Sequence, residues 1–106
     1  MRVDANPSMV ELSNSGTPVS LVSLDELIRE QSAPVPRVLK IDVEGAESRV
    51  LRGAVDLLHT HRPSIVLAAH GWRQRAECRS ILEAHGYGIT TLRDGRIDGN
   101  YLLLAT

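Results

Sequence analysis

Two short, mainly apolar runs, separated by a segment with helical periodicity, constrain the fold of this chain most strongly. The runs cover residues 38–43 and 64–69. Continuous apolar runs are typical of strands that are buried on both faces of a sheet, as in parallel sheets. The segment between them, residues 46–59, is long enough for a crossover helix. The sequence therefore predicts a right-handed βαβ unit with two parallel strands.

The segment between the two runs carries its apolar side chains at helical spacing. Five of them share one face of the expected helix: Val50, Leu51, Ala54, Val55 and Leu58. Gly53 lies inside this helix, where glycine costs about 1 kcal/mol relative to alanine. We expect a close approach of the helix to the sheet to compensate for that cost.

The residues before the βαβ unit predict a short helix and little else that is regular. Residues 1–16 are polar and rich in turn formers, with a short strand over residues 9–12, and residues 17–23 alternate as a strand does. Ser23 and Glu26 have the spacing of a capping box for a helix over residues 24–30.

The residues after the unit predict a second helix and two further strands. The helix covers residues 73–85, offers Ala76, Ile81, Leu82 and Ala84 to the core, and ends at Gly86. Strands over residues 87–92 and 101–105 are separated by Asp-Gly pairs that favour turns. The whole chain, residues 1–106, is thus predicted to be one α/β domain with a parallel βαβ core, a helix and an antiparallel C-terminal hairpin at the edge of the sheet.

Composition excludes several classes of protein. Twelve basic and 13 acidic side chains give a net charge of -1, which provides no long-range attraction for nucleic acid. Cys78 is the only cysteine, so no internal disulfide forms, and a reducing cytoplasm is expected. No apolar run approaches the roughly 20 residues of a membrane helix, so no membrane contact is expected.

A motif at the end of the first apolar run suggests a family. Residues 40–47 read Lys-Ile-Asp-Val-Glu-Gly-Ala-Glu and residues 50–54 read Val-Leu-Arg-Gly-Ala. Together with residues 22–28, Arg62-Pro63 and residues 85–87, this pattern resembles the FkbM methyltransferases. The resemblance implies a Rossmann-like class I methyltransferase fold, S-adenosylmethionine as cofactor, and methyl transfer to a hydroxyl of a sugar or natural product as the small-molecule acceptor.

The part of that family which holds the cofactor has no counterpart in these residues. The only Gly-x-Gly, at residues 86–88, follows a helix and precedes a strand, the reverse of the order that a cofactor turn needs. No residue matches a cofactor-binding position. We therefore expect the chain to be the C-terminal half of a methyltransferase domain, truncated and inactive alone, and unable to bind S-adenosylmethionine by itself.

Two residues are the predicted catalytic pair. Asp42 and His70 lie at the carboxyl ends of the two predicted parallel strands, where open α/β sheets bind ligands. Together they could orient or deprotonate a hydroxyl, as methyl transfer to oxygen requires. Asp42 could instead cap nearby backbone amides, and His70 could be a metal ligand or a satisfied polar group.

Three further residues are predicted to bind substrate: Glu44, Glu47 and Trp72. For the two glutamates the structural alternative is stabilisation of a helix N-terminus, worth about 0.3–1 kcal/mol. For Trp72 the alternative is a partly covered indole on a solvated helix face.

Two other functions remain open on the sequence. One is a non-catalytic interaction module or degenerate fragment, because the strand that contains Ile41 is expected to lack a neighbour, and an unpaired apolar edge favours a homodimer. The other is an unrelated hydrolase with a metal ion on Asp42, Glu44 and His70, since carboxylates suit Mg²⁺ or Mn²⁺. Neither a metal site nor a cofactor site is part of the favoured prediction.

Overall fold

The computed structural model describes residues 2–3, 9–11, 23–31 and 33–106, which form a mixed α/β structure. Its sheet has the strand order β1-β2-β3-β4-β6-β5. In chain order the elements are β1 (Arg2–Val3), β2 (Met9–Glu11), α1 (Leu24–Arg29), β3 (Val38–Ile41), α2 (Glu47–Arg52), the π-helical turn η1 (Leu57–His61), β4 (Ser64–His70), α3 (Trp72–Ala84), β5 (Ile89–Arg93) and β6 (Asn100–Ala105).

The predicted parallel pairing of the βαβ unit is confirmed, but its first strand is buried on one face only, since Val38 and Lys40 are exposed. Strands β3 and β4 are parallel neighbours, with Ile41 paired to Leu67. The C-terminal hairpin is also present at one edge of the sheet, as predicted. Strand β6 pairs antiparallel with β4 on one side and with β5 on the other, so β5 is the edge strand. The hairpin therefore inserts its last strand into the sheet beside β4.

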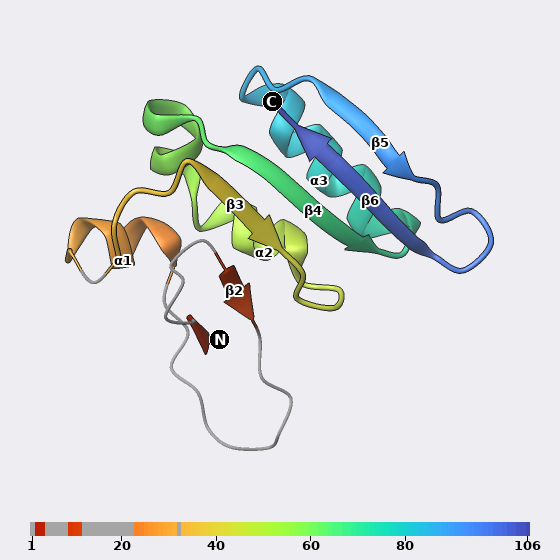
Figure 1. Ribbon diagram of the computed structural model, residues 1–106, viewed down its shortest axis with the longest axis horizontal. Coiled ribbons are helices and arrows are strands. Elements are labelled where there is room, and N and C mark those ends of the chain that lie inside the picture. Colours follow the sequence, from red (N-terminus) through yellow and green to blue (C-terminus); the bar gives the residue numbers. More distant parts are fainter. Residues whose placement is uncertain (1, 4–8, 12–22, 32) are drawn as a thin grey trace.

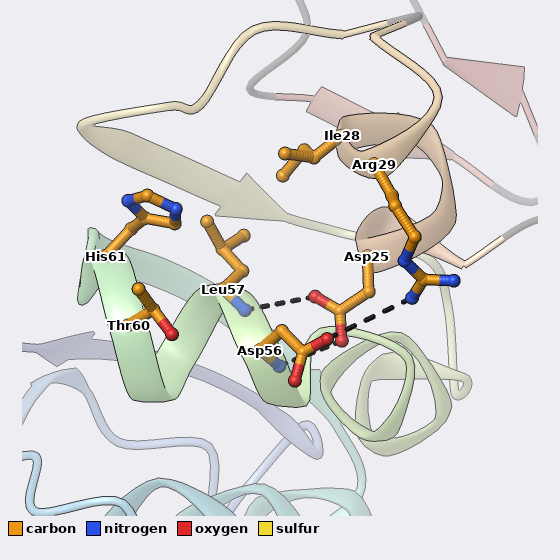
Figure 2. A pocket seen from close by; sticks show the side chains of 7 residues that line it. All are labelled: Asp25, Ile28, Arg29, Asp56, Leu57, Thr60 and His61. Carbon is orange, nitrogen blue, oxygen red and sulfur yellow. Dashed lines mark hydrogen bonds and ion pairs between the residues drawn. The ribbon is translucent and has the colours of Figure 1, made fainter.

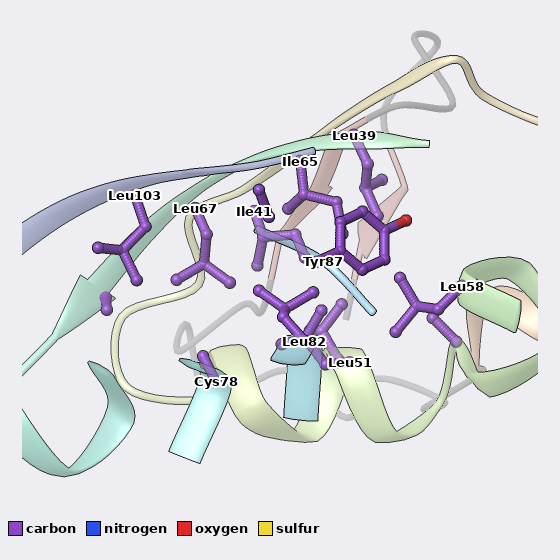
Figure 3. Close-up of a cluster of buried hydrophobic side chains, with 14 of the residues drawn as sticks. Leu39, Ile41, Leu51, Leu58, Ile65, Leu67, Cys78, Leu82, Tyr87 and Leu103 are labelled. Atoms are coloured by element: carbon purple, nitrogen blue, oxygen red, sulfur yellow. The ribbon is translucent and has the colours of Figure 1, made fainter. Parts of the chain in front are cut away.

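Helices cover one face of the sheet (Figure 1). Strands β4 and β6 alternate between buried and half-buried residues, and their buried side chains face α2 and α3, which lie behind the strands in the view of Figure 1. Figure 3 shows the core between these layers, in which leucines and isoleucines of the strands meet the helices. Its fully buried members include Leu39, Ile41, Leu51, Leu82 and Leu103. A core without phenylalanine is thus built from branched aliphatic side chains.

The helix expected between β3 and β4 is interrupted. Helix α2 ends at Arg52, and η1 begins only at Leu57. Val55 is 46% exposed instead of facing the core, and Leu57, which the prediction does not include, is buried. The other four residues of the predicted apolar face are buried as predicted: Val50, Leu51, Ala54 and Leu58.

Gly53 marks this break, and its close neighbour is not the sheet. A Cβ atom at Gly53 would lie 2.9 Å from the Cβ atom of Ser23. Ser23 is the N-cap of α1, where its hydroxyl accepts the Glu26 N–H at 3.1 Å, as the capping pattern predicts. The Gly53 carbonyl accepts the N–H of Asp25 at 3.0 Å. Gly53 thus lets the start of α1 dock on the end of α2.

Helix α3 occurs where it is predicted, but the side chains that it buries differ from the predicted ones. Cys78 and Leu82 are its fully buried residues, and Ile81 is half-buried. Ala76 and Ala84, which the prediction also turns inward, are exposed. Cysteine behaves as a small apolar side chain here. Gly86 follows the helix with φ of 84°, the conformation expected for a glycine that ends a helix.

The strand that contains Ile41 has a neighbour, contrary to the sequence-based expectation. Met9 and Val10 of β2 pair in parallel with Lys40 and Ile41 of β3. Of the described strands, β1 and β5 form the two edges of the sheet. The strand expected over residues 17–23 lies outside the described residues. Dimerisation through a sheet edge stays a prediction, but it cannot rest on β3.

A backbone hydrogen bond ties the hairpin to the start of α3. The N–H of Gly71, the N-cap of α3, donates to the carbonyl of Gly99 at 2.6 Å. Next to it, His70 of β4 is paired in register with Asn100 of β6.

Within the part of the chain that is described, no helix is both long and apolar enough to span a membrane.

Candidate functional site

The two predicted catalytic side chains meet at the carboxyl edge of the sheet. Asp42 directly follows β3, and His70 is the last residue of β4. Because these strands are parallel neighbours, their ends share one edge, and the Nε2 atom of His70 lies 3.6 Å from Oδ1 of Asp42. The side chain of Asp42 is 51% exposed and that of His70 is 30% exposed. A carboxylate and an imidazole are therefore adjacent and accessible to a ligand.

Glu47 lies behind this pair and is fully buried. It is the first residue of α2, and its side chain has no exposed surface. One carboxylate oxygen, Oε2, accepts the N–H groups of Gly45 and Ala46 at 2.7 and 3.2 Å. The other, Oε1, accepts the backbone N–H of His70 at 2.8 Å and lies 3.3 Å from the His70 Nδ1 atom. This burial corrects the predicted placement of Glu47 beside a substrate, since a ligand cannot reach it.

The turn between β3 and α2 has an unusual backbone. Glu44 and Gly45 both have positive φ, of 48° and 97°. Such a conformation is uncommon for a residue other than glycine. The turn brings the Gly45 and Ala46 amides onto the Glu47 carboxylate and leaves the Glu44 side chain exposed. Glu44 is thus accessible on the same turn as Asp42, as a substrate-binding role requires.

Trp72 is the first residue of α3 and lies two positions after His70. Its side chain is 66% exposed. The Arg73 guanidinium carbon is 5.4 Å from the centre of the indole ring. An exposed aromatic face beside a strand end is compatible with ligand contact, and the same contact with Arg73 also fits a solvated helix face.

Gln74 helps to hold the site in place, and no pattern in the sequence indicates this role. Its Oε1 atom accepts the backbone N–H of Ser48 at 3.0 Å. Ser48 follows Glu47 in the first turn of α2, whereas Gln74 is 26 positions away on α3. This bond holds the start of α2 against α3, and only the fold brings the two residues together.

The metal hypothesis finds no support in the geometry. Within the described ranges, no three His, Cys, Asp or Glu side chains are arranged so that they could hold a metal ion. Glu44 does not join Asp42 and His70 in such a group.

One pocket lies away from the Asp42–His70 edge. It has a volume of about 150 Å³ and is lined by residues of α1 and η1 (Figure 2), including Ile28, Thr60 and His61. The Asp25 carboxylate in this pocket accepts the N–H groups of Asp56 and Leu57 at 2.9 and 3.0 Å. Helix η1 leads into the first residue of β4, so this pocket is at the opposite end of that strand from His70.

A second pocket is closer to the site. It has a volume of about 370 Å³ and is lined by Arg75, Thr91, Asp94, Arg96 and Tyr101. The Arg75 guanidinium carbon is 5.1 Å from the centre of the Tyr101 ring. Tyr101 is paired with Ala69 of β4, and its side chain is buried with the core, on the helix-covered face of the sheet. The pocket therefore opens near the same edge as His70.

Comparison with known proteins gives one match. Residues 4–89 match the methyltransferase FkbM domain, which is most of the 106-residue chain. No curated protein and no solved structure matches the chain. The matched range includes Asp42, Glu47, His70 and the strands and helices that position them. The chain therefore belongs to the FkbM methyltransferase family.

Proposed function

We propose that the chain provides the acceptor-activating side of an O-methyltransferase that acts on a hydroxyl of a sugar or natural product. The observation that carries this proposal is the 3.6 Å distance between His70 Nε2 and Asp42 Oδ1 at the exposed carboxyl ends of β3 and β4. Family membership supports methyl transfer as the reaction class. Methylation of a hydroxyl requires loss of its proton, and a histidine is the side chain best suited to accept a proton near neutral pH.

In this proposal the two side chains have different tasks. His70 accepts the hydroxyl proton at Nε2, the nitrogen that faces Asp42. Asp42 orients the hydroxyl, and its negative charge stabilises the imidazolium that proton transfer creates. The exposed groups at this edge, Glu44 and Trp72, contact the rest of the acceptor: Glu44 by hydrogen bonds to further hydroxyls and Trp72 by its ring face.

Family membership suggests S-adenosylmethionine as the methyl donor, but the described residues do not fit it. Two turns lead from a strand into a helix at this edge. In the first, the Glu47 carboxylate occupies the Gly45 and Ala46 amides. In the second, the Gly71 N–H is bonded to Gly99. Neither turn offers these amides to a cofactor, so we assign no cofactor contact to the described residues.

We also propose that the sheet is part of a Rossmann-like class I methyltransferase fold. The parallel order of β2, β3 and β4, followed by the antiparallel strand β6, supports this proposal. So does the position of the Asp42–His70 pair beyond the carboxyl ends of the strands, where doubly wound sheets bind ligands.

Acceptor binding can be tested by NMR on the ¹⁵N-labelled chain. Titration with a panel of methyl glycosides is expected to shift the backbone amide signals of Asp42, Glu44, His70 and Trp72. Replacement of His70 by alanine should abolish these shifts. His59→Ala is the matched control, since His59 is an exposed histidine of η1 away from the site. Glycoside shifts that map elsewhere, or that survive His70→Ala unchanged, would refute the proposal.

The cofactor statement has its own test. Calorimetric titration of the chain with S-adenosylmethionine is expected to show no saturable binding. Saturable binding at micromolar concentration would show that the chain holds the cofactor by contacts we have not assigned.

A further inference from the structure

We propose that Glu47 is a positioning residue that places the proton of His70 on Nδ1 and leaves Nε2 as the proton acceptor. The proposal rests on the role given to His70 above, and it assigns the buried carboxylate a task that neither the motif nor the family match specifies. Glu47 does not touch a substrate. It acts through His70, whose backbone and ring it contacts with the same oxygen atom.

The donors around Glu47 define its protonation state. Three backbone N–H groups, those of Gly45, Ala46 and His70, point at its two oxygens. An ionised carboxylate has only acceptor sites, so it satisfies all three. A carboxylic acid would have one proton to place, and the only possible acceptor among these partners is Nδ1 of His70. Because all three backbone partners are donors, the surroundings favour the ionised form of Glu47.

An ionised Glu47 in turn determines the tautomer of His70. Nδ1 lies 3.3 Å from Oε1, and a carboxylate oxygen can only accept a hydrogen bond. Nδ1 must therefore carry the proton. A neutral imidazole has one N–H, so Nε2 keeps its lone pair. Nε2 faces the exposed edge, where an acceptor hydroxyl would bind. It lies 3.6 Å from Asp42 Oδ1, beyond hydrogen-bond distance, so Asp42 does not require a proton on Nε2 as Glu47 does on Nδ1.

The complete burial of Glu47 distinguishes this role from ordinary stabilisation of a helix N-terminus. A carboxylate can stabilise the first turn of a helix from the surface, whereas burial of a charge is costly unless hydrogen bonds compensate for it. Two of the compensating donors belong to the β3–α2 turn, and the third belongs to the end of β4. The carboxylate thus connects the chain segment of Asp42 to that of His70 and fixes both relative to each other.

Long-range ¹H–¹⁵N NMR of histidine rings tests the proposal directly, because it distinguishes the two neutral tautomers. In the wild-type chain we expect His70 to be in the Nδ1–H form at a pH where it is neutral. In Glu47→Gln, the amide oxygen is expected to keep the Gly45 and Ala46 N–H groups. Its NH₂ group then replaces Oε1, so the His70 backbone N–H loses its acceptor and Nδ1 faces a donor. The ring proton should move to Nε2, changing the tautomer ratio about tenfold or more.

Two variants serve as controls. Glu47→Asp keeps the acceptor chemistry and should retain the Nδ1–H form. Glu83→Gln removes the charge of an exposed glutamate that pairs with Arg79 and should leave the His70 spectrum unchanged. A purely structural role for Glu47 would alter stability in Glu47→Gln without reversing the tautomer.

An Nδ1–H tautomer that persists in Glu47→Gln would overturn the proposal, and so would an Nε2–H tautomer in the wild-type chain. If Glu47→Gln does not fold, the wild-type tautomer decides alone, with Nδ1–H in support and Nε2–H against. This experiment needs no acceptor. Absence of the glycoside shifts described above would therefore refute the proposed function and leave the role of Glu47 intact. An Nδ1–H tautomer that persists in Glu47→Gln would refute the role of Glu47 alone, whereas an Nε2–H tautomer in the wild-type chain would also remove the proton acceptor that the proposed function assigns to His70.

Discussion

Replacement of Gly53 by alanine sets two effects of opposite sign against each other. Gly53 has φ of -85° and ψ of 7°, a conformation that alanine adopts without strain. Alanine at such a position normally stabilises a protein by about 0.4–1 kcal/mol, because it restricts the unfolded chain. On backbone preference alone, Gly53→Ala should therefore raise the free energy of unfolding.

The packing around Gly53 predicts the opposite. The new Cβ atom would lie 2.9 Å from Cβ and 3.4 Å from Cα of Ser23. Ser23 cannot easily retreat, since its hydroxyl caps α1 and the neighbouring Asp25 N–H is bonded to the Gly53 carbonyl. Overpacking of this kind costs about 1–3 kcal/mol. We expect the packing cost to dominate, with a net loss of about 1–2 kcal/mol and a fall in Tm of roughly 4–16 °C.

Urea denaturation followed by circular dichroism measures this change. Gly88→Ala is the matched control: Gly88 has no positive φ, and no atom lies within 4 Å of the position that its Cβ would occupy. That variant should be stabilised by about 0.4–1 kcal/mol. If Gly53→Ala were as stable as Gly88→Ala or more so, the contact between the start of α1 and the end of α2 would not exist as described.

Two further predictions concern stability and thiol chemistry. Asp25→Ala removes the carboxylate that accepts the Asp56 and Leu57 N–H groups (Figure 2). Urea denaturation should show a loss of about 1 kcal/mol in the free energy of unfolding, as for loss of a helix cap. Asp25→Asn should lose less, and equal losses in the two variants would contradict the capping role. Burial, followed by the nearby Glu47 and Glu77 carboxylates, raises the pKa of Cys78 from 9.0 to about 12. The folded state therefore holds this proton more tightly than the unfolded state, so the associated stability is complete below pH 9 and is lost as the pH rises towards 12. Urea denaturation at several alkaline pH values should show this loss of stability in the wild-type chain and a smaller loss in Cys78→Ala. A disulfide reagent at pH 8 should label Cys78 only after the chain unfolds.

The elements of the fold could be predicted from local pattern, but their exact packing could not. The apolar runs and the helical segment between them are sufficient to predict β3, β4 and their parallel pairing. The close approach of Gly53 to Ser23 could not be predicted, because the two residues are distant in sequence. The insertion of β6 beside β4 likewise depends on long-range pairing that alternation within one strand does not encode.

The candidate site divides in the same way. Asp42 and His70 could be located because a residue at the carboxyl end of a parallel strand has a predictable position. The burial of Glu47 could not, since an acidic residue in the first turn of a helix is usually exposed and its spacing gives no sign of a histidine on the next strand. The pairing with His70 becomes visible only when the β3–α2 turn and the end of β4 are placed side by side.

Strand β6 belongs to the sheet and the core but lies outside the residues that match the family. The match ends at residue 89, before the final strand begins. Yet β6 pairs with β4 along its length from Ile65 to His70, and Leu103 and Ala105 belong to the buried core. A protein shortened at the end of the match would expose the backbone of β4 and leave the core open beside His70. The last 17 residues are therefore structurally indispensable to the site, although the recognisable motif lies wholly before them.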